Sequence, residues 1–266
     1  MAKHKLYLFC LMLGISAVCQ AQTLSIRPYV NYHHSVSKQT EPYFSYFDYF
    51  GHGHIFRIGN ENFTLSSGFE FGIAADYRFH SDWGVELGVG YFSSITNSYD
   101  LLLSVRGETT HHWDYGSIVV RPLLNHVVTR GKSTFIGKAG PIAHYSFAKI
   151  TELSPLVFGW TNPNPNPNML RFANKWSLGY SLGLEFNYQL MERLHLSVNL
   201  GYEQYRYTPS RATIGDNSGV WAEIRYVNEI VGEPHTPLPH IVTLKDAVLF
   251  NNIHFGIGIK YNLWKR

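Results

Sequence analysis

Hydrophobic and polar residues alternate strictly along the segment from Trp176 to Tyr207. One set of alternate positions is apolar: Leu178, Tyr180, Leu182, Leu184, Phe186, Tyr188 and Leu190. The other set holds small, amide and charged residues: Ser177, Gly179, Ser181, Gly183, Glu185, Asn187 and Gln189. A period of two predicts a β-strand with one apolar and one polar face. A polar turn at residues 191–193 follows, and the alternation resumes over residues 194–202.

These strands are longer than the five or six residues that are usual in soluble proteins. Long amphipathic strands joined by short turns are typical of transmembrane β-barrels, in which the apolar face meets lipid and the polar face lines the lumen. The sequence therefore predicts an all-β fold, a closed antiparallel transmembrane β-barrel in the outer membrane.

The same pattern predicts eight strands, with three short turns and four long loops in alternation. The strands are expected over residues 23–36, 69–79, 85–92, 116–128, 133–148, 176–190, 194–207 and 248–264, and the loops over residues 37–66, 96–115, 149–175 and 208–246. A strand extension above the membrane at Leu101–Val105 stays open as an alternative within the second loop. Short periplasmic turns and long outer loops are typical of such barrels, and an even strand number places both termini on the periplasmic side. A ten-strand barrel, with an added strand pair that includes Val220–Val231, stays open as an alternative.

Pro122 and Pro141 lie in the interior of expected strands. Pro122 and Pro141 cannot donate a hydrogen bond to a neighbouring strand, and a closed barrel has no free edge that would tolerate this loss. We therefore expect both prolines at β-bulges or near strand ends. The alternating Asn and Pro residues of 162–168 exclude regular pairing in that part of the third long loop.

The chain begins with the features of an export signal. A basic start, an apolar run over Leu6–Val18 and small residues before Gln22 predict a cleavable signal peptide over residues 1–21 and a barrel domain over residues 22–266. The apolar run is too short to span a bilayer as a helix. An alternative is a lipoprotein acylated at Cys19, although the preceding Val18 is bulky where a small residue is expected.

Cleavage changes the chemistry that is available to the mature protein. It removes Cys10 and Cys19, the only cysteines of the 266-residue chain, and so excludes disulfides and cysteine metal sites. The formal charge falls from +3 to +1 because Lys3 and Lys5 leave with the signal. A charge this small gives no reason to expect nucleic acid as a partner. The expected partners are outer-membrane lipid and proteins that bind the outer loops, and no cofactor is expected.

One strand–turn–strand segment resembles a known family. The strand Ser117–Leu124, a short turn and the strand Phe135–Pro141 resemble the core of the PorT-like outer-membrane β-barrel family of the Bacteroidota. The signal ending at Gln20–Gln22 and the final strand Phe255–Leu263 are also similar to that group. The resemblance implies an eight-stranded outer-membrane barrel, with one branch of the family linked to protein secretion, and it brings no catalytic residues.

Charged residues gather on the inward positions of the expected strands. They are Arg27, Glu70, Asp76, Arg78, Glu86, Arg121, Lys138, Glu185, Glu203 and Lys260. Five acids against five bases predict ion pairs that fill the lumen, because eight strands enclose an interior that side chains just fill. The alternative is a gated polar pathway, which would make the protein a small-solute channel.

Histidines supply the candidate metal ligands. His52, His54, His111 and His112 fall on expected outer loops, where imidazoles from two loops could hold a divalent ion, and the competing interpretation is that they are solvated loop residues. Separately, His33, His34 and Ser35 suggest a lipid-modifying hydrolase at the membrane rim. That hypothesis requires a base and an orienting acid near the serine, and the sequence contains no Gly-x-Ser-x-Gly motif.

Aromatic residues form two further sets. A dense run in the first loop, Tyr43, Phe44, Tyr46, Phe47, Tyr49 and Phe50, predicts a surface for a protein partner, or alternatively a segment that covers the barrel mouth. Tyrosines near the strand ends fit the interfacial aromatic girdle: Tyr32, Tyr91, Tyr145, Tyr188 and Tyr202. The leading hypothesis is a non-enzymatic barrel with a filled lumen that acts through its outer loops in a structural, adhesion or assembly role.

Overall fold

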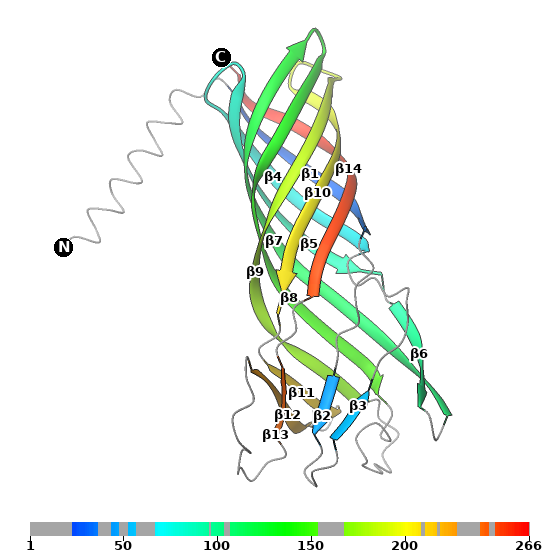
Figure 1. Cartoon of the computed structure of the whole chain (residues 1–266). Coiled ribbons are helices and arrows are strands. Elements are labelled where there is room, and N and C mark those ends of the chain that lie inside the picture. Colours follow the sequence, from blue (N-terminus) through cyan, green and yellow to red (C-terminus); the bar gives the residue numbers. More distant parts are fainter. Residues whose placement is uncertain are drawn as a thin grey trace, which may run out of the picture.

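The computed structural model describes most of the expected barrel and several segments beyond it. The described residues are 23–36, 44–47, 53–56, 67–95, 97–103, 107–153, 168–208, 211–216, 219–227, 240–244 and 248–265. Every regular element among them is a β-strand (Figure 1). None of these residues belongs to a helix with the length and apolar character needed to cross a membrane. The predicted signal peptide lies outside the described residues.

Eight strands close into an antiparallel barrel. They are β1 (Thr23–Ser35), β4 (Gly68–Arg78), β5 (Trp83–Ser94), β7 (Gly107–Arg130), β8 (Ser133–Leu153), β9 (Asn168–Gln189), β10 (Leu194–Tyr207) and β14 (Val248–Lys265). They pair in the order β10, β14, β1, β4, β5, β7, β8 and β9, and the pairing of β9 with β10 closes the ring. Closure gives every barrel strand a paired neighbour on both sides, with short interruptions, which is the arrangement that a lipid environment requires. The predicted fold class is confirmed.

The three short turns lie at one end of the barrel together with the start of β1 and the end of β14. Residues 79–82, 131–132 and 190–193 make these turns, and Thr23 of β1 pairs there with Lys265 of β14 and with Arg78 of β4. Gly131 takes a φ of 59°, which is a conformation that favours glycine. We call this the turn end and the opposite end the loop end. In Figure 1 the turn end is at the top.

Strands β7, β8 and β9 continue past the barrel at the loop end. They contain 24, 21 and 22 residues, whereas β1 and β4 contain 13 and 11. The predicted loops at residues 96–115 and 149–175 are therefore wrong in part, because β6 (Asn97–Leu103) pairs with β7 there and β8 pairs with the start of β9. Beyond the lipid, both faces of a strand can meet water, so these extensions lack the apolar alternation that revealed the barrel strands.

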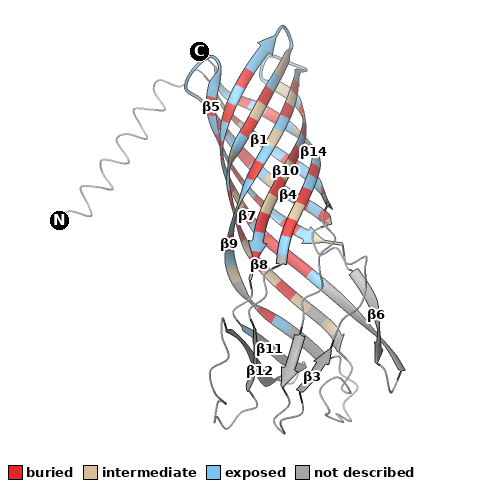
Figure 2. Cartoon of the chain, in the orientation of Figure 1, coloured by how far each residue is buried: buried red, intermediate tan, exposed pale blue. Residues whose placement is uncertain are grey.

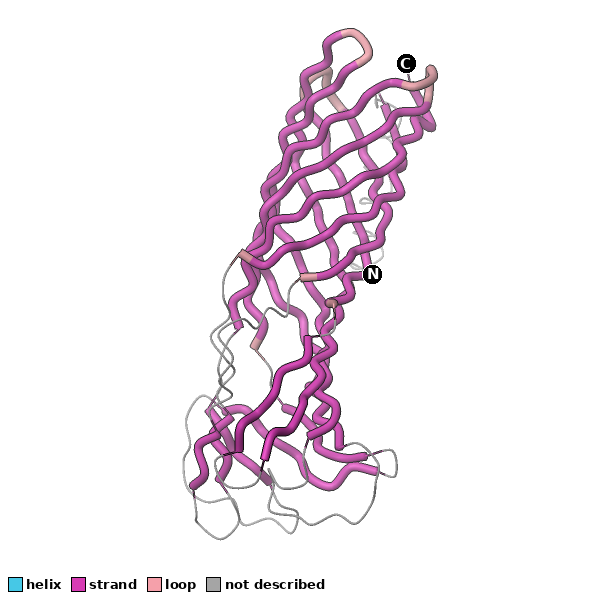
Figure 3. The backbone as a smooth tube through the Cα atoms, turned by 90° about the vertical axis from the view of Figure 1, so that its right-hand side faces the viewer, coloured by secondary structure: helices cyan, strands magenta, loops and turns pink. Residues whose placement is uncertain are grey.

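Five shorter strands complete the loop end (Figure 3). The strands β2 (Phe44–Phe47) and β3 (Gly53–Phe56) form a hairpin, and β11 (Arg211–Asp216), β12 (Gly219–Val227) and β13 (His240–Leu244) extend the sheet from the outer part of β9. The ten-strand alternative is wrong. β12 is indeed a strand, but it pairs only with β11 and β13 among the described residues, while β9 and β10 close the barrel without it.

Buried and exposed residues alternate along the barrel strands in Figure 2, and the exposed positions are largely apolar whereas most buried positions are polar. Leu178 and Leu184 are 76% and 66% exposed, values that would be unfavourable in water. Exposed aromatic rings form one band near each end of the wall. The turn-end band contains Phe79, Trp83, Phe135, Tyr188, Tyr261 and Trp264, and the loop-side band contains Tyr32, Phe69, Tyr91, Trp176 and Tyr180. The half-buried rings of Tyr145 and Tyr202 lie against Trp176 and Tyr180. Such paired bands mark the two interfaces of a bilayer.

The two strand prolines correct another expectation. Pro122 of β7 lies opposite Pro141 of β8, in the middle of both strands, and not at a bulge or a strand end. The pairing stops after Val120 and Ala143 and resumes at Leu124 and Ala139 with the register unchanged. Each proline remains paired on its other side, with β5 or with β9. By facing each other, the two prolines confine both missing donors to one short interruption.

Candidate functional site

The lumen is the most highly organised part of the described structure. The inward positions of all eight barrel strands meet there, and they form four successive layers between the turn end and the loop end. These layers are a polar vestibule, a turn-side charge cluster, a loop-side charge cluster and an aromatic layer.

The vestibule opens at the turn end. It is a cavity of about 160 Å³ whose lining includes Ser25, Asp76, Asn125, Asn187, Lys260 and Asn262. Lys260 Nζ lies 2.9 Å from Asp76 Oδ2, and the Asn125 side-chain amide donates to Asp76 Oδ1 at 3.0 Å. Water can therefore enter the lumen from this side as far as the first ion pairs.

The turn-side charge cluster comprises Arg27, Asp76, Glu86, Lys138, Glu185 and Lys260. Arg27 donates to both oxygens of Glu86, at 3.2 and 3.1 Å, and pairs with Glu185 at 3.2 Å. Lys138 forms close ion pairs with Glu86 and Glu185. Three cations face three carboxylates, so the cluster is neutral as a whole. Buried charges are tolerated only when they are paired in this way.

The loop-side charge cluster is centred on Arg121, which lies on β7. Its guanidinium donates to both oxygens of Glu70 on β4, at 2.5 and 2.6 Å, and to both oxygens of Glu203 on β10, at 2.5 and 3.1 Å. The Tyr29 hydroxyl donates to Glu70 at 2.7 Å. One guanidinium thus joins strands on opposite sides of the ring with paired, charge-assisted hydrogen bonds.

Only a small internal space lies between the two charge clusters. It is a cavity of about 40 Å³, and its lining includes Arg27, Tyr29, Arg121, Lys138 and His254. A cavity of this size has room for a few water molecules at most. It shares no lining residue with the vestibule.

An aromatic layer covers the charge clusters on the loop side. It contains Phe92, Tyr115, His144, Tyr205, Tyr207 and Phe250, all buried. The Tyr205 ring stacks on the rings of Phe250 and His144, with distances between ring centroids of 4.7 and 3.7 Å, and Phe250 also stacks on Tyr115, with centroids 5.0 Å apart. This layer adds an apolar barrier to the two charged ones.

The structure brings nine of the ten predicted lumen charges into these ion pairs. Arg78 is the exception, because it lies half-buried at the last position of β4, where it lines the vestibule. A strand-end position gives the side chain access to water, so it needs no partner inside the barrel.

Several lumen residues are not evident from the sequence. Tyr29, His33 and His254 belong to the loop-side cluster, and the aromatic layer was not expected at all. One signal was present: Tyr29, Phe92 and Tyr205 share the strand parity of the inward charges. An aromatic residue on the polar parity of a barrel strand is better interpreted as lumen filling than as a break in the pattern.

The other candidate residues that the structure describes belong to β2, β3 and β7. His111 and His112 are part of β7, His54 is part of β3, and Phe44, Tyr46 and Phe47 are part of β2, but their side chains are not described. His52, Tyr43, Tyr49 and Phe50 lie outside the described residues. A metal site or a partner surface built from these residues stays a prediction.

The hydrolase hypothesis gains no support from the described rim. His34 points outward, whereas the His33 ring points inward and contacts Glu70. A serine–histidine contact does exist, between Ser117 Oγ and His144 Nδ1 at 3.1 Å, but both residues are buried inside the lumen, where His144 is part of the aromatic layer. His144 Nε2 has no hydrogen-bond partner among the described groups, so the orienting acid of a catalytic set is missing from this pair.

Comparison with solved structures supports the fold. The outer membrane protein OprG from Pseudomonas aeruginosa matches with a TM-score of 0.51 and 15% identity, over 93% of this chain and 98% of OprG. Two further outer membrane proteins match less well. A major outer membrane protein from Thermus thermophilus has a TM-score of 0.47 and 16% identity, over 90% of this chain and 99% of that chain. Neisserial surface protein A has a TM-score of 0.40 and 11% identity, over 90% of this chain and 97% of that chain. No protein-family model and no curated protein matches the sequence. The OprG likeness and the apolar wall together make the chain an outer-membrane β-barrel protein.

Proposed function

We propose that this protein is a non-conducting outer-membrane barrel that acts through its loop end, in adhesion or in assembly with protein partners. The filled lumen is the observation that carries the proposal. Two charge clusters and an aromatic layer occupy the interior in series, and the charged side chains are held by partners from several strands. A solute would have to break buried ion pairs to pass.

The loop end is the part of the molecule that is free to act. Strands β7, β8 and β9 extend beyond the barrel (Figure 1). The shorter strand β6 pairs with β7, and β11, β12 and β13 continue the sheet from β9. The hairpin of β2 and β3 contains Phe44, Tyr46 and Phe47 of the aromatic run. An extended sheet with exposed edges can bind a further strand from a partner. The sequence resemblance to the PorT-like family, one branch of which is linked to protein secretion, favours the assembly role within this proposal.

Conductance in a planar bilayer tests this function directly. The refolded protein should insert and remain electrically silent, and insertion is checked by its heat-modifiable migration on a gel. A variant with the aromatic layer reduced, Tyr205→Ala with Phe250→Ala, serves as a comparison for partial opening. Steady openings of the wild-type protein would refute the proposal and make the small-solute channel the better hypothesis.

A further inference from the structure

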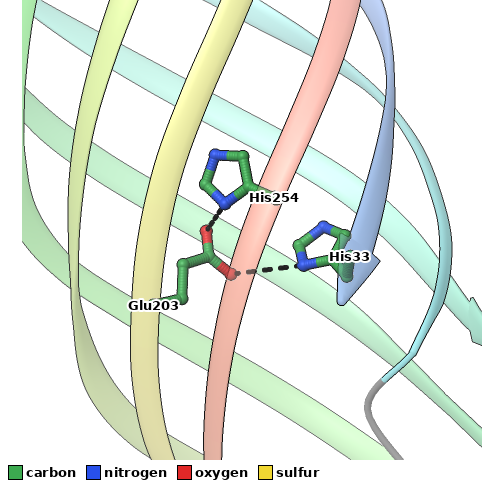
Figure 4. Close-up of side chains that lie close together, drawn as sticks. All are labelled: His33, Glu203 and His254. Carbon is green, nitrogen blue, oxygen red and sulfur yellow. Dashed lines mark ion pairs between the residues drawn. The ribbon is translucent and has the colours of Figure 1, made fainter. Parts of the chain in front are cut away.

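Two histidines and a carboxylate converge inside the loop-side charge cluster. His33 lies on β1, Glu203 on β10 and His254 on β14, and Figure 4 shows both rings turned toward the carboxylate. His254 Nδ1 is 3.6 Å from Glu203 Oε1, and His33 Nδ1 is 3.9 Å from Glu203 Oε2. The three ligand atoms all lie within 4.8 Å of one another. Residues far apart in the sequence thus present three donor atoms to one point.

The Nδ1 atoms of His33 and His254 are both available as ligands. His33 is 1% exposed and His254 is 8% exposed, and neither Nδ1 has a hydrogen-bond partner among the described groups. Their distances to Glu203 exceed those of a hydrogen bond. Buried polar atoms are rarely left in this state unless the site has a specific role.

The contact of His33 Nε2 sets the tautomer that the ring adopts when it acts as a ligand. His33 Nε2 lies 2.8 Å from Glu70 Oε2, and Arg121 and Tyr29 donate to the same carboxyl group. A carboxylate only accepts hydrogen bonds, so the Nε2 atom carries a proton toward Glu70 and Nδ1 is the nitrogen that can offer its lone pair to an ion. The same carboxylate–imidazole contact orients the histidines of metal centres.

The charges of this cluster favour a cation. Arg121 is the one permanent cation in contact with Glu70 and Glu203 among the described residues, which leaves one negative charge in excess. The turn-side cluster, in contrast, is balanced. Two imidazole nitrogens and a carboxylate are the ligands that Zn²⁺ and similar first-row ions prefer, whereas Mg²⁺ and Ca²⁺ require oxygen ligands.

We propose that His33, Glu203 and His254 form a binding site for Zn²⁺ or a similar divalent transition-metal ion. Tetrahedral bonds of about 2.0–2.2 Å separate ligand atoms by roughly 3.3–3.5 Å. The three ligand atoms, which lie within 4.8 Å of one another, would therefore move closer together when the ion binds. Glu203 keeps its contact with Arg121 and bridges the guanidinium and the ion. The cavity of about 40 Å³ that His254 helps to line has room for a water molecule as the fourth ligand. The ion would tie β1, β10 and β14 together.

Cobalt absorption provides the experimental test. The full mature protein is refolded in detergent with a chelator, freed of the chelator and titrated with Co²⁺, whose tetrahedral complexes absorb visible light. We expect one equivalent of Co²⁺ to bind, Zn²⁺ to displace it, and Zn²⁺ to raise the melting temperature relative to chelator. His33→Ala and His254→Ala should each abolish the visible band.

Two sets of variants serve as controls for the position of the ion. A quadruple variant with His52, His54, His111 and His112 changed to Ala should keep the band. If an alanine variant fails to fold, as judged by gel migration, His33→Gln and His254→Gln replace it. The proposal is overturned if folded wild-type protein shows neither the band nor the Zn²⁺-dependent stabilisation. It is also overturned if the band survives loss of the two lumen histidines or disappears with the four loop histidines.

Discussion

Removal of Arg121 should be one of the most damaging single substitutions in the lumen. Its guanidinium donates four hydrogen bonds of 2.5–3.1 Å to Glu70 and Glu203, and both carboxylates have no exposed surface. Arg121→Met keeps much of the side-chain volume but leaves two buried carboxylates without their cation. Breaking a buried ion pair from one side costs about 3–5 kcal/mol. We expect a loss of that size in the free energy of unfolding.

A second variant separates the effect of charge from the effect of packing. Combining Arg121→Met with Glu70→Gln and Glu203→Gln removes the whole ionic group, and such replacements are often neutral because no charge is left unpaired. The triple variant should therefore recover most of the stability that the single variant loses. As a surface control, Lys149→Ala breaks an exposed pair with Asp114 at 3.6 Å and should cost about 0–1 kcal/mol.

Reversible urea unfolding in phospholipid vesicles, followed by tryptophan fluorescence, measures all three variants. The midpoint and the slope must be fitted together, because an altered slope would indicate a different unfolded or folded state. If the free energy of unfolding of Arg121→Met lies within about 1 kcal/mol of the wild-type value, Glu70 and Glu203 are not buried carboxylates that depend on Arg121 for their counter-charge. If the triple variant is as unstable as the single one, packing and not charge explains the loss.

Three further predictions concern the wall, the turn-side cluster and a turn. Leu182→Arg places a charge on the lipid-facing side and should lower the free energy of unfolding in vesicles by about 2–4 kcal/mol, whereas Leu190→Arg at the turn end should lower it by about 0–1 kcal/mol. Equal losses in the two variants would show that the assigned membrane depth is wrong. Glu185→Gln should lower the melting temperature more than Ser181→Ala, because Glu185 bonds Lys138; equal melting would contradict a stabilising charge network. Gly131→Ala should cost about 1–2 kcal/mol in the same unfolding assay because of its positive φ, and an unchanged stability would argue against that backbone conformation.

The barrel was predictable because one physical rule determines it. Lipid outside and polar groups inside force a period of two on every spanning strand, so the alternation around Leu182 and Leu184 revealed both the strand and its orientation. The same parity identified the inward charges. Pairing partners were beyond the sequence, because they depend on which strands face each other across the ring, as Arg121 and Glu203 do.

The remaining features depend on contacts that leave no periodic trace. The extensions of β7, β8 and β9 lie beyond the apolar wall, where lipid no longer imposes a period of two on the sequence. The opposed prolines required knowledge of register, since only the pairing of β7 with β8 sets Pro122 against Pro141. His33 and His254 are separated by most of the chain and meet Glu203 only after closure, so local spacing could not indicate them.

The bridging of opposite strands by Arg121 has a consequence for how such a barrel can evolve. A change in any one member of its cluster leaves the charges of the others buried without a partner. A viable lineage must therefore replace these residues together or first pass through a neutral intermediate such as glutamine. Among the described side chains of the loop end, Lys149 and Asp114 form an exposed ion pair, so a change in that pair leaves no charge buried. Among related barrels, we expect linked substitutions at positions 70, 121 and 203 beside freely diverging outer segments.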